Sequence, residues 1–175
     1  NIFSDQNLKR KDDLILIIGK TTGHLTQSIY ANELLNYKKG LPPKVNLEEE
    51  LKNGLALKEL INKRLIDTSH DISDGGLLIA LTEMSMKNLI GFNVIIEKDN
   101  LNSYLFGEDQ ARYAVAVEEH KIEDVRLLLN EKNVFFEEIG QTCKDEIIVN
   151  NKKISILELK EIYENWFSNY LSKAP

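Results

Sequence analysis

Three short stretches of this chain place glycines beside polar side chains, a combination suited to binding phosphate groups or metal ions. The first is GKTTGH at residues 19–24, directly after an apolar run. Glycine lets the backbone approach a ligand closely, and the start of a following helix offers free N–H groups. The spacing does not match the Walker pattern of glycine, four residues and Gly-Lys-Ser/Thr. Gly23 and His24 therefore belong either to a phosphate-binding loop or to a plain turn between a strand and a helix.

The second stretch is SHDISDGG at residues 69–76, followed by an apolar run that predicts a buried helix. Ser73 or Asp74 can cap this helix, because a short polar side chain accepts hydrogen bonds from the first N–H groups. Glycines inside a helix cost roughly 1 kcal/mol each relative to alanine. We therefore expect the bare backbone of Gly75 and Gly76 to face an anion or a closely packed neighbouring domain.

His70 and Asp71 lie in the same stretch and have the side chains of an acid/base pair or of two metal ligands. Adjacent residues of these types more often form a hydrogen bond within a loop. We therefore assign no catalytic residue and no metal ligand to this chain.

The third stretch is FGEDQAR at residues 106–112, directly before another apolar run. Glu108 and Asp109 have the oxygen ligands that magnesium prefers, with phosphate oxygens completing the coordination. Gln110 can contact an amide or a ribose. Arg112 can line the same site or pair with Glu108 in a purely structural role.

Apolar runs and turn signals predict the elements that must position these stretches. Short runs rich in β-branched residues predict strands, whereas apolar residues three and four apart predict helices. The turn residues Asn150-Asn151 predict a hairpin between two short strands. Without strict β-α-β alternation, the pattern indicates an α+β fold with a mixed sheet flanked by helices. We expect strands at 14–18, 94–96, 113–117, 134–139 and 147–149, and helices at 28–36, 47–64, 77–86, 122–129 and 156–171.

Residues 1–13 are polar and predict a linker, so that a single domain covers residues 14–175. A helix held in the core positions the loop before it more rigidly than a free loop could be held. The core anchors expected in the helix after the second stretch are Leu77, Ile79, Ala80, Leu81 and Met84.

Composition excludes several classes of protein. The formal net charge of −6 disfavours a broad nucleic-acid surface. The longest apolar run, Leu14 to Ile18, is too short to span a bilayer, so no membrane partner is expected. Cys143 is the only cysteine, which excludes an intrachain disulfide and a thiolate zinc cluster and fits the cytoplasm. The first residue is not methionine, which fits a piece of a longer chain or a trimmed one.

Together, GKTTGHLTQSIYANELL, SHDISDGGLLIALTEMSM and LFGEDQARYAVAV resemble the last domain of the synthetase subunit in the phosphoribosylformylglycinamidine synthase family. This family belongs to a superfamily of aminoimidazole-ribonucleotide-synthetase-like enzymes. The resemblance runs from about Asp13 to the end of the chain. Two residues depart from the family pattern: Asp109 stands where serine is common, and Ala111 replaces a second serine.

The resemblance implies a longer polypeptide with two homologous halves, each an ATP-binding domain followed by a C-terminal domain like this one. It implies ATP-dependent amidation of formylglycinamide ribonucleotide by ammonia from glutamine, which gives formylglycinamidine ribonucleotide. ATP and Mg²⁺ serve the full enzyme, and none is expected to bind this fragment tightly. The catalytic and metal-binding residues lie on earlier domains, residues 1–13 link to one of them, and a glutaminase subunit and a small third subunit are the partners.

By internal symmetry, this domain should contribute to a nucleotide or phosphate cleft that a neighbouring domain completes, and it should be inactive alone. The alternatives are a structural or assembly module supporting the ATP-binding half, and the equivalent domain of another synthetase in the superfamily. A small independent kinase-like protein is disfavoured by the missing Walker spacing. The candidate cleft residues are Gly23, His24, Ser73, Asp74, Gly75, Gly76, Glu108, Gln110 and Arg112.

Overall fold

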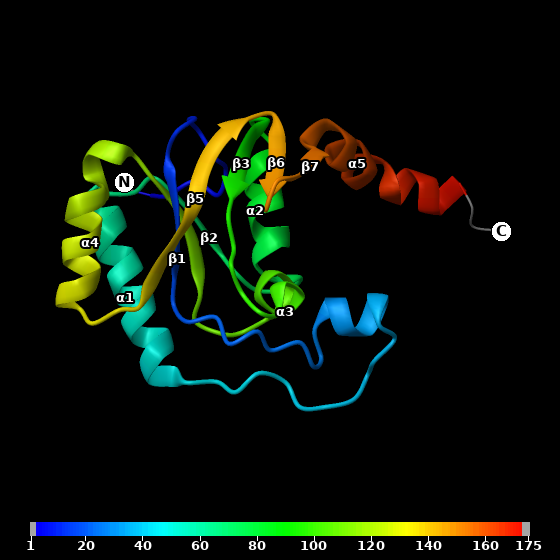
Figure 1. Ribbon diagram of the computed structural model, residues 1–175, viewed down its shortest axis with the longest axis horizontal. Coiled ribbons are helices and arrows are strands. Elements are labelled where there is room, and N and C mark those ends of the chain that lie inside the picture. Colours follow the sequence, from blue (N-terminus) through cyan, green and yellow to red (C-terminus); the bar gives the residue numbers. More distant parts are fainter. Residues whose placement is uncertain (1–2, 173–175) are drawn as a thin grey trace.

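The computed structural model describes residues 3–172, and its strands form a seven-stranded sheet with helices on both faces (Figure 1). The outermost residues of the predicted linker and domain therefore fall outside the described part. The strands are β1 (Leu14–Ile18), β2 (Thr68–Asp71), β3 (Ile90–Val94), β4 (Tyr113–Val117), β5 (Phe136–Lys144), β6 (Glu146–Val149) and β7 (Lys152–Ser155). The helices are α1 (Leu47–Asn62), α2 (Gly76–Met86), α3 (Leu101–Phe106), α4 (Ile122–Glu131) and α5 (Ile156–Ser172), with short turns η1 (Tyr30–Leu34) and η2 (Glu119–Lys121).

The strand order is β2-β4-β1-β5-β3-β6-β7. Only the β3–β6 pair is parallel among these neighbours, so the sheet is mixed, and the predicted α+β class is confirmed. Because β1 and β2 both pair antiparallel with β4, they run in the same direction. The loops that follow β1 and β2 therefore meet the loop that precedes β4 at one edge of the sheet.

Alternate residues of β1 belong to two hydrophobic cores, one on each face of the sheet, and these cores hold the strand ends in place. Ile15 and Ile17 join a buried cluster beneath α2 and α3, whereas Leu16 and Ile18 join one beneath α1 and α4. The side chains of a strand point alternately to its two faces, so one apolar run serves both layers. Figure 1 shows the resulting three layers, with α1 and α4 on the left of the sheet and α2 and α3 on the right.

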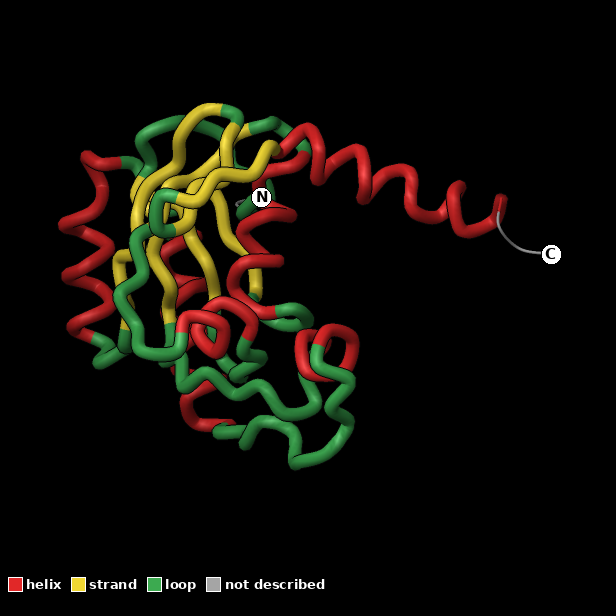
Figure 2. Tube along the Cα trace, turned by 45° about the vertical axis from the view of Figure 1, so that its right-hand side comes forward, coloured by secondary structure: helices red, strands yellow, loops and turns green. Residues whose placement is uncertain are grey.

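Two segments project from these layers on the same side of the molecule (Figures 1 and 2). One is the long connection between β1 and α1, which carries η1. The other is α5, of whose described residues only Ile156 is buried. Its exposed apolar side chains include Tyr163, Trp166 and Phe167.

The segment predicted as a linker packs onto the domain where the structure describes it. Leu8 is completely buried, and its backbone N–H donates to the carbonyl of Met84 over 2.8 Å. The polar composition of residues 1–13 gave no indication that Leu8 anchors the segment in the core. That the segment leads from a preceding domain stays a prediction.

Several predicted boundaries are wrong. The helix expected at 28–36 is only the five-residue turn η1, since Asn36 has a positive φ of 49°. The strand expected at 94–96 is β3, which begins earlier, at Ile90, and already ends at Val94. A Cβ on Gly91 would lie 2.0 Å from the carbonyl oxygen of Glu146, so glycine permits the close strand contact but also hides the strand pattern.

Two elements were not predicted, and one strand is displaced. The strand β2 consists of TSHD, whose polar side chains read as a loop. The helix α3 is short and begins at Asn100, whose side chain accepts a hydrogen bond from the N–H of Ser103. The strand β5 starts two residues later than the predicted 134–139 and continues to Lys144. The hairpin predicted at residues 150–151 joins β6 and β7.

The helix predicted at 77–86 is α2, and its core anchors are confirmed except one. Leu77, Ala80, Leu81 and Met84 are each at most 3% exposed. Ile79 is 40% exposed, because it lies on the face of α2 turned away from the sheet. The uniformly apolar sequence gave no periodicity from which this face could be distinguished.

Candidate functional site

The three stretches meet at the sheet edge formed by the ends of β1 and β2 and the start of β4. We call this the loop cluster, made of residues 19–24, 73–76 and 107–112. Two adjacent carboxylates of the third stretch hold it together: Glu108 binds the second stretch and Asp109 binds the first. The sheet topology therefore joins all three sequence motifs in one place.

Glu108 is a connector between backbone segments. Its Oε1 accepts hydrogen bonds from the N–H of Gly75 at 2.9 Å and of Ile29 at 2.8 Å. Its own N–H donates to the carbonyl of His24 at 3.0 Å. With these contacts the half-buried carboxylate holds the loop after β2 against residue Ile29, in the long connection between β1 and α1. It forms no ion pair with Arg112 within 4.0 Å, so the structural pairing considered from sequence is not present.

Asp109 fills the loop that resembles a phosphate loop in sequence. Its carboxylate accepts hydrogen bonds from the backbone N–H groups of Thr22, Gly23 and His24, at 3.1, 2.9 and 3.3 Å. It also accepts a hydrogen bond from the Thr22 hydroxyl. The N–H groups expected to face a phosphate are therefore satisfied by the protein itself.

Arg112, the last residue of the loop cluster, has a completely buried side chain. Its Nε donates to the carbonyl of Asp109 at 3.1 Å, and its Nη2 donates to that of Gly107 at 2.6 Å. Nη1 donates to the Thr21 hydroxyl at 3.1 Å. Burial lowers the pKa of this guanidinium, and the nearby Asp109 carboxylate opposes the shift. Arg112 thus braces the first and third stretches from inside.

The glycine pair is explained by packing within the domain, which corrects the expectation that its bare backbone faces outward. Both residues are buried and have positive φ angles, +80° at Gly75 and +75° at Gly76. A Cβ at Gly76 would lie 2.7 Å from the carbonyl carbon of Phe106 and 2.8 Å from the carbonyl oxygen of Gly107. Only glycine allows the start of α2 to approach the third stretch this closely.

The predicted helix cap is also wrong. Gly75 is the N-cap of α2, in a left-handed conformation and without a side-chain hydrogen bond. Ser73 contributes only its carbonyl, which accepts from the N–H of Gly76 at 3.1 Å. The side chains of Ser73 and Asp74 are thereby left at the surface.

The solvent-facing part of the loop cluster is small and polar. His24 is only partly exposed, and its Nε2 lies 2.9 Å from the carbonyl oxygen of Leu41, so it ties down the η1 connection. Of the sequence candidates, three therefore present exposed side chains to a ligand or a neighbouring domain: Ser73, Asp74 and Gln110. Lys20 and Thr22 are exposed beside them.

The carboxylates considered as magnesium ligands from sequence are largely engaged by the protein. Both oxygens of Asp109 and one oxygen of Glu108 accept hydrogen bonds from the protein. Across residues 3–172, no group of three or more histidine, cysteine, aspartate or glutamate side chains is placed to hold a metal ion.

The described helices also include none long and apolar enough to cross a membrane.

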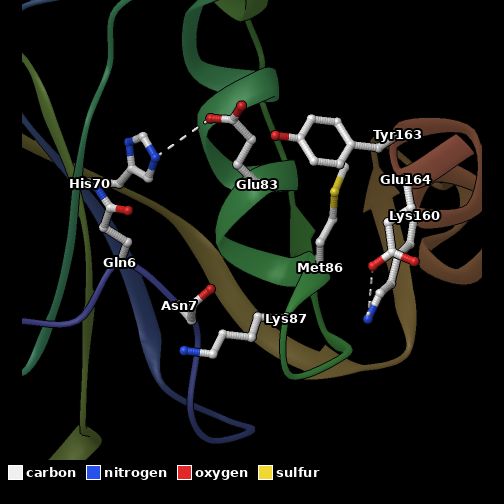
Figure 3. Close-up of a pocket in the computed structure, with 9 residues that line it drawn as sticks. All are labelled: Gln6, Asn7, His70, Glu83, Met86, Lys87, Lys160, Tyr163 and Glu164. Carbon is white, nitrogen blue, oxygen red and sulfur yellow. Dashed lines mark ion pairs between the residues drawn. The ribbon is translucent and has the colours of Figure 1, made fainter. Parts of the chain in front are cut away.

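His70 lies away from the loop cluster, beside a cavity of about 420 Å³ between β2, α2 and α5 (Figure 3). Its Nδ1 lies 2.6 Å from the backbone oxygen of Asp71, which can only accept, so Nδ1 carries a proton. Its Nε2 faces Glu83 at 3.5 Å (Figure 3). The contact with Asp71 is thus the local hydrogen bond that the sequence favoured over a catalytic pair.

Asn53 is a positioning residue that sequence reasoning missed. It is 5% exposed on α1, and its side-chain amide donates to the carbonyl of Ala111 at 2.9 Å. Ala111 has a positive φ of 61°, so this bond holds a strained turn of the third stretch. A signal was available, because Asn53 precedes the buried Ala56 and Leu60 at helical spacing. A polar residue on a buried helix face usually has a specific partner.

The family described as AIR synthase related protein, C-terminal domain, matches residues 10–150. Among curated relatives, the phosphoribosylformylglycinamidine synthase subunit PurL of Pelagibacter ubique is 41% identical over 170 residues, which cover 94% of this chain and 23% of that protein. Two solved Thermotoga maritima structures share the fold. PurL complexed with ATP has a TM-score of 0.69 at 18% identity, covering 91% of this chain and 27% of that one. The PurLQS structure has a TM-score of 0.68 at 19% identity, covering 90% and 27%.

Proposed function

The chain belongs to the AIR synthase related proteins, whose C-terminal domain it matches, and from this premise we propose that it is a domain of phosphoribosylformylglycinamidine synthase. The observation that carries the proposal is the 41% identity to a PurL subunit across 94% of this chain. The chain spans 23% of that relative's length, so the activity belongs to a larger protein. That activity is the ATP-dependent conversion of formylglycinamide ribonucleotide and ammonia to formylglycinamidine ribonucleotide.

Within that protein, the proposed role of this domain is to form one wall of a nucleotide or phosphate cleft. The loop cluster supports this role, because it presents Ser73, Asp74 and Gln110 at one rigid edge of the sheet. Glu108 and Arg112 support the cleft from within, since Oε1 of Glu108 and all three nitrogens of the Arg112 guanidinium bond to the protein. Gly75 and Gly76 also support the cleft indirectly, because the absence of a side chain allows the loops to pack closely.

The related PurL structure with ATP supports ATP as a substrate of the full enzyme. We propose that Mg²⁺ in the full enzyme is held by other domains, since the described residues include no group of three or more histidine, cysteine, aspartate or glutamate side chains placed to hold a metal ion. We further propose assembly with a glutaminase subunit and a small third subunit, which the PurLQS complex of the relative supports. The single, unpaired Cys143 supports a cytoplasmic location.

Titration calorimetry of ATP and Mg²⁺ into this chain tests whether it holds only part of a site. We expect no submicromolar binding, because a neighbouring domain supplies the remaining contacts. Tight binding by the chain alone would contradict the shared cleft. The mass of the native polypeptide provides an independent test, since a mass near 20.1 kDa would exclude a multidomain enzyme.

A purely structural module is the second candidate, and the internal packing of both glycines favours it. Alanine substitutions at Ser73, Asp74 and Gln110 separate the two roles, because these side chains are exposed and their loss should leave stability within about 0.5 kcal/mol. In the full enzyme, slower turnover with an unchanged melting temperature supports the cleft. Unchanged turnover supports the structural module.

A further inference from the structure

Asp109 occupies a site whose chemistry is that of an anion receptor. Its side chain is only 9% exposed and accepts hydrogen bonds from three successive backbone N–H groups, those of Thr22, Gly23 and His24. The Thr22 hydroxyl adds a fourth donor. Successive backbone N–H groups that converge in this way form a nest, a concavity that binds anions in many phosphate sites.

The geometry of the nest is built into the backbone. Gly23 has a positive φ of +78°, and an added Cβ would lie 2.8 Å from the Cβ of Ser103. This position therefore requires glycine, and its close packing against Ser103 restrains the turn in addition to the hydrogen bonds to Asp109. The three N–H groups should keep pointing into the same small volume when the carboxylate is removed.

A buried positive charge lies behind the nest. The nearest atoms of Arg112 and Asp109, Nη1 and Oδ2, are 3.9 Å apart, and the Arg112 side chain is completely buried. No other carboxylate among the described residues lies within 4.0 Å of this guanidinium, and its hydrogen bonds go to neutral oxygens. A buried charge is costly unless it is paired, so this site needs an anion.

We propose that the nest of Thr22, Gly23 and His24 is an oxyanion site of the phosphate class, which this chain fills with its own Asp109 carboxylate. The carboxylate takes the place of a phosphate or sulfate ion and accepts the hydrogen bonds that such an ion would accept. The first stretch therefore has the donors of a phosphate loop but excludes free phosphate in the intact chain. This inference rests on the loop geometry and is independent of the proposed enzymatic function.

Chemical rescue with inorganic phosphate tests the proposal. Asp109→Ala and Asp109→Ser remove the carboxylate and leave space for an ion, so both should lower the melting temperature by several degrees in chloride buffer. Added phosphate or sulfate should then raise the melting temperature in a saturable way. At a concentration about 100 times its Kd, the ion should increase the folded-to-unfolded ratio about 100-fold. Calorimetry should give one phosphate per chain for these variants and none for the wild type.

Three matched controls separate a specific site from a general salt effect. Asp109→Asn loses the charge but keeps the volume, so it should be destabilised without rescue. Asp145→Ala removes one negative charge from an exposed loop, and Leu81→Ala destabilises the core. Phosphate or sulfate should raise the melting temperature of these two variants no more than chloride of equal ionic strength does.

The possible outcomes decide the proposal in either direction. Saturable rescue confined to the alanine and serine variants of Asp109 supports it. A response equal to that of Asp145→Ala and Leu81→Ala overturns it, as does stoichiometric phosphate binding to the wild type. If both variants are unfolded in chloride, the refolding yield from urea replaces the melting temperature. Refolding with phosphate but not with chloride supports the site, and refolding with neither overturns it.

Discussion

Replacing Gly76 with alanine should destabilise the domain through backbone contacts within the loop cluster. The residue begins α2 with a φ of +75°, a conformation that L-amino acids with side chains rarely adopt. The new Cβ would lie 2.7 Å from the carbonyl carbon of Phe106 and 2.8 Å from the carbonyl oxygen of Gly107. Both contacts are with backbone, so no side-chain rotation can relieve them.

Two costs add in this variant. The left-handed conformation costs a non-glycine residue about 1–2 kcal/mol. Forcing an extra methyl group into a closely packed site costs about 1–3 kcal/mol more, because the turn at Phe106 and Gly107 must shift. The expected loss in the free energy of unfolding is therefore about 2–5 kcal/mol.

Gly54→Ala is the matched control, because it makes the same substitution inside a helix. An added Cβ there would meet only the Tyr113 hydroxyl, at 3.6 Å, which is an ordinary contact. Alanine in a helix interior is better than glycine by about 1 kcal/mol, so this variant should be slightly more stable than the wild type. Urea unfolding followed by circular dichroism measures both variants. If Gly76→Ala lies within about 0.5 kcal/mol of the wild type, the proposed backbone clash is wrong.

Two further predictions test the core and an ion pair. Leu81→Ala should lower the free energy of unfolding, measured in urea, by about 2–5 kcal/mol, because Leu81 is 1% exposed. Ile79→Ala should lower it far less, because Ile79 is 40% exposed. Equal losses would contradict the assigned face of α2. Arg10 lowers the pKa of Asp67 from 3.8 to about 2, so this carboxylate stabilises the fold above about pH 4, and the contribution disappears as the pH falls toward 2. The stability difference between the wild type and Asp67→Asn should be small, because the ion pair is partly exposed. This difference should be constant at higher pH and absent near pH 2. A difference that grows on acidification would refute this assignment.

The sequence determined the elements whose apolar pattern is strong. The central strands β1 and β4 have the predicted bounds, and α2 and α4 lie where their apolar residues indicated. It also identified the three stretches that form the loop cluster and the family resemblance that they carry. These features depend on residues that are close together in the chain, so a local reading detects them.

Only the tertiary structure decided which groups of the loop cluster face outward. Asp109 and Thr22 are 87 residues apart in the sequence, and the pairing of β1 with β4 brings them together. The pairing of β2 with β4 places the third stretch against Gly76, and the folded loops bury the Arg112 side chain. A polar side chain has the same local pattern whether it faces a ligand or an internal partner. The difference arises from long-range hydrogen bonds and close packing, and these exist only once the sheet has formed.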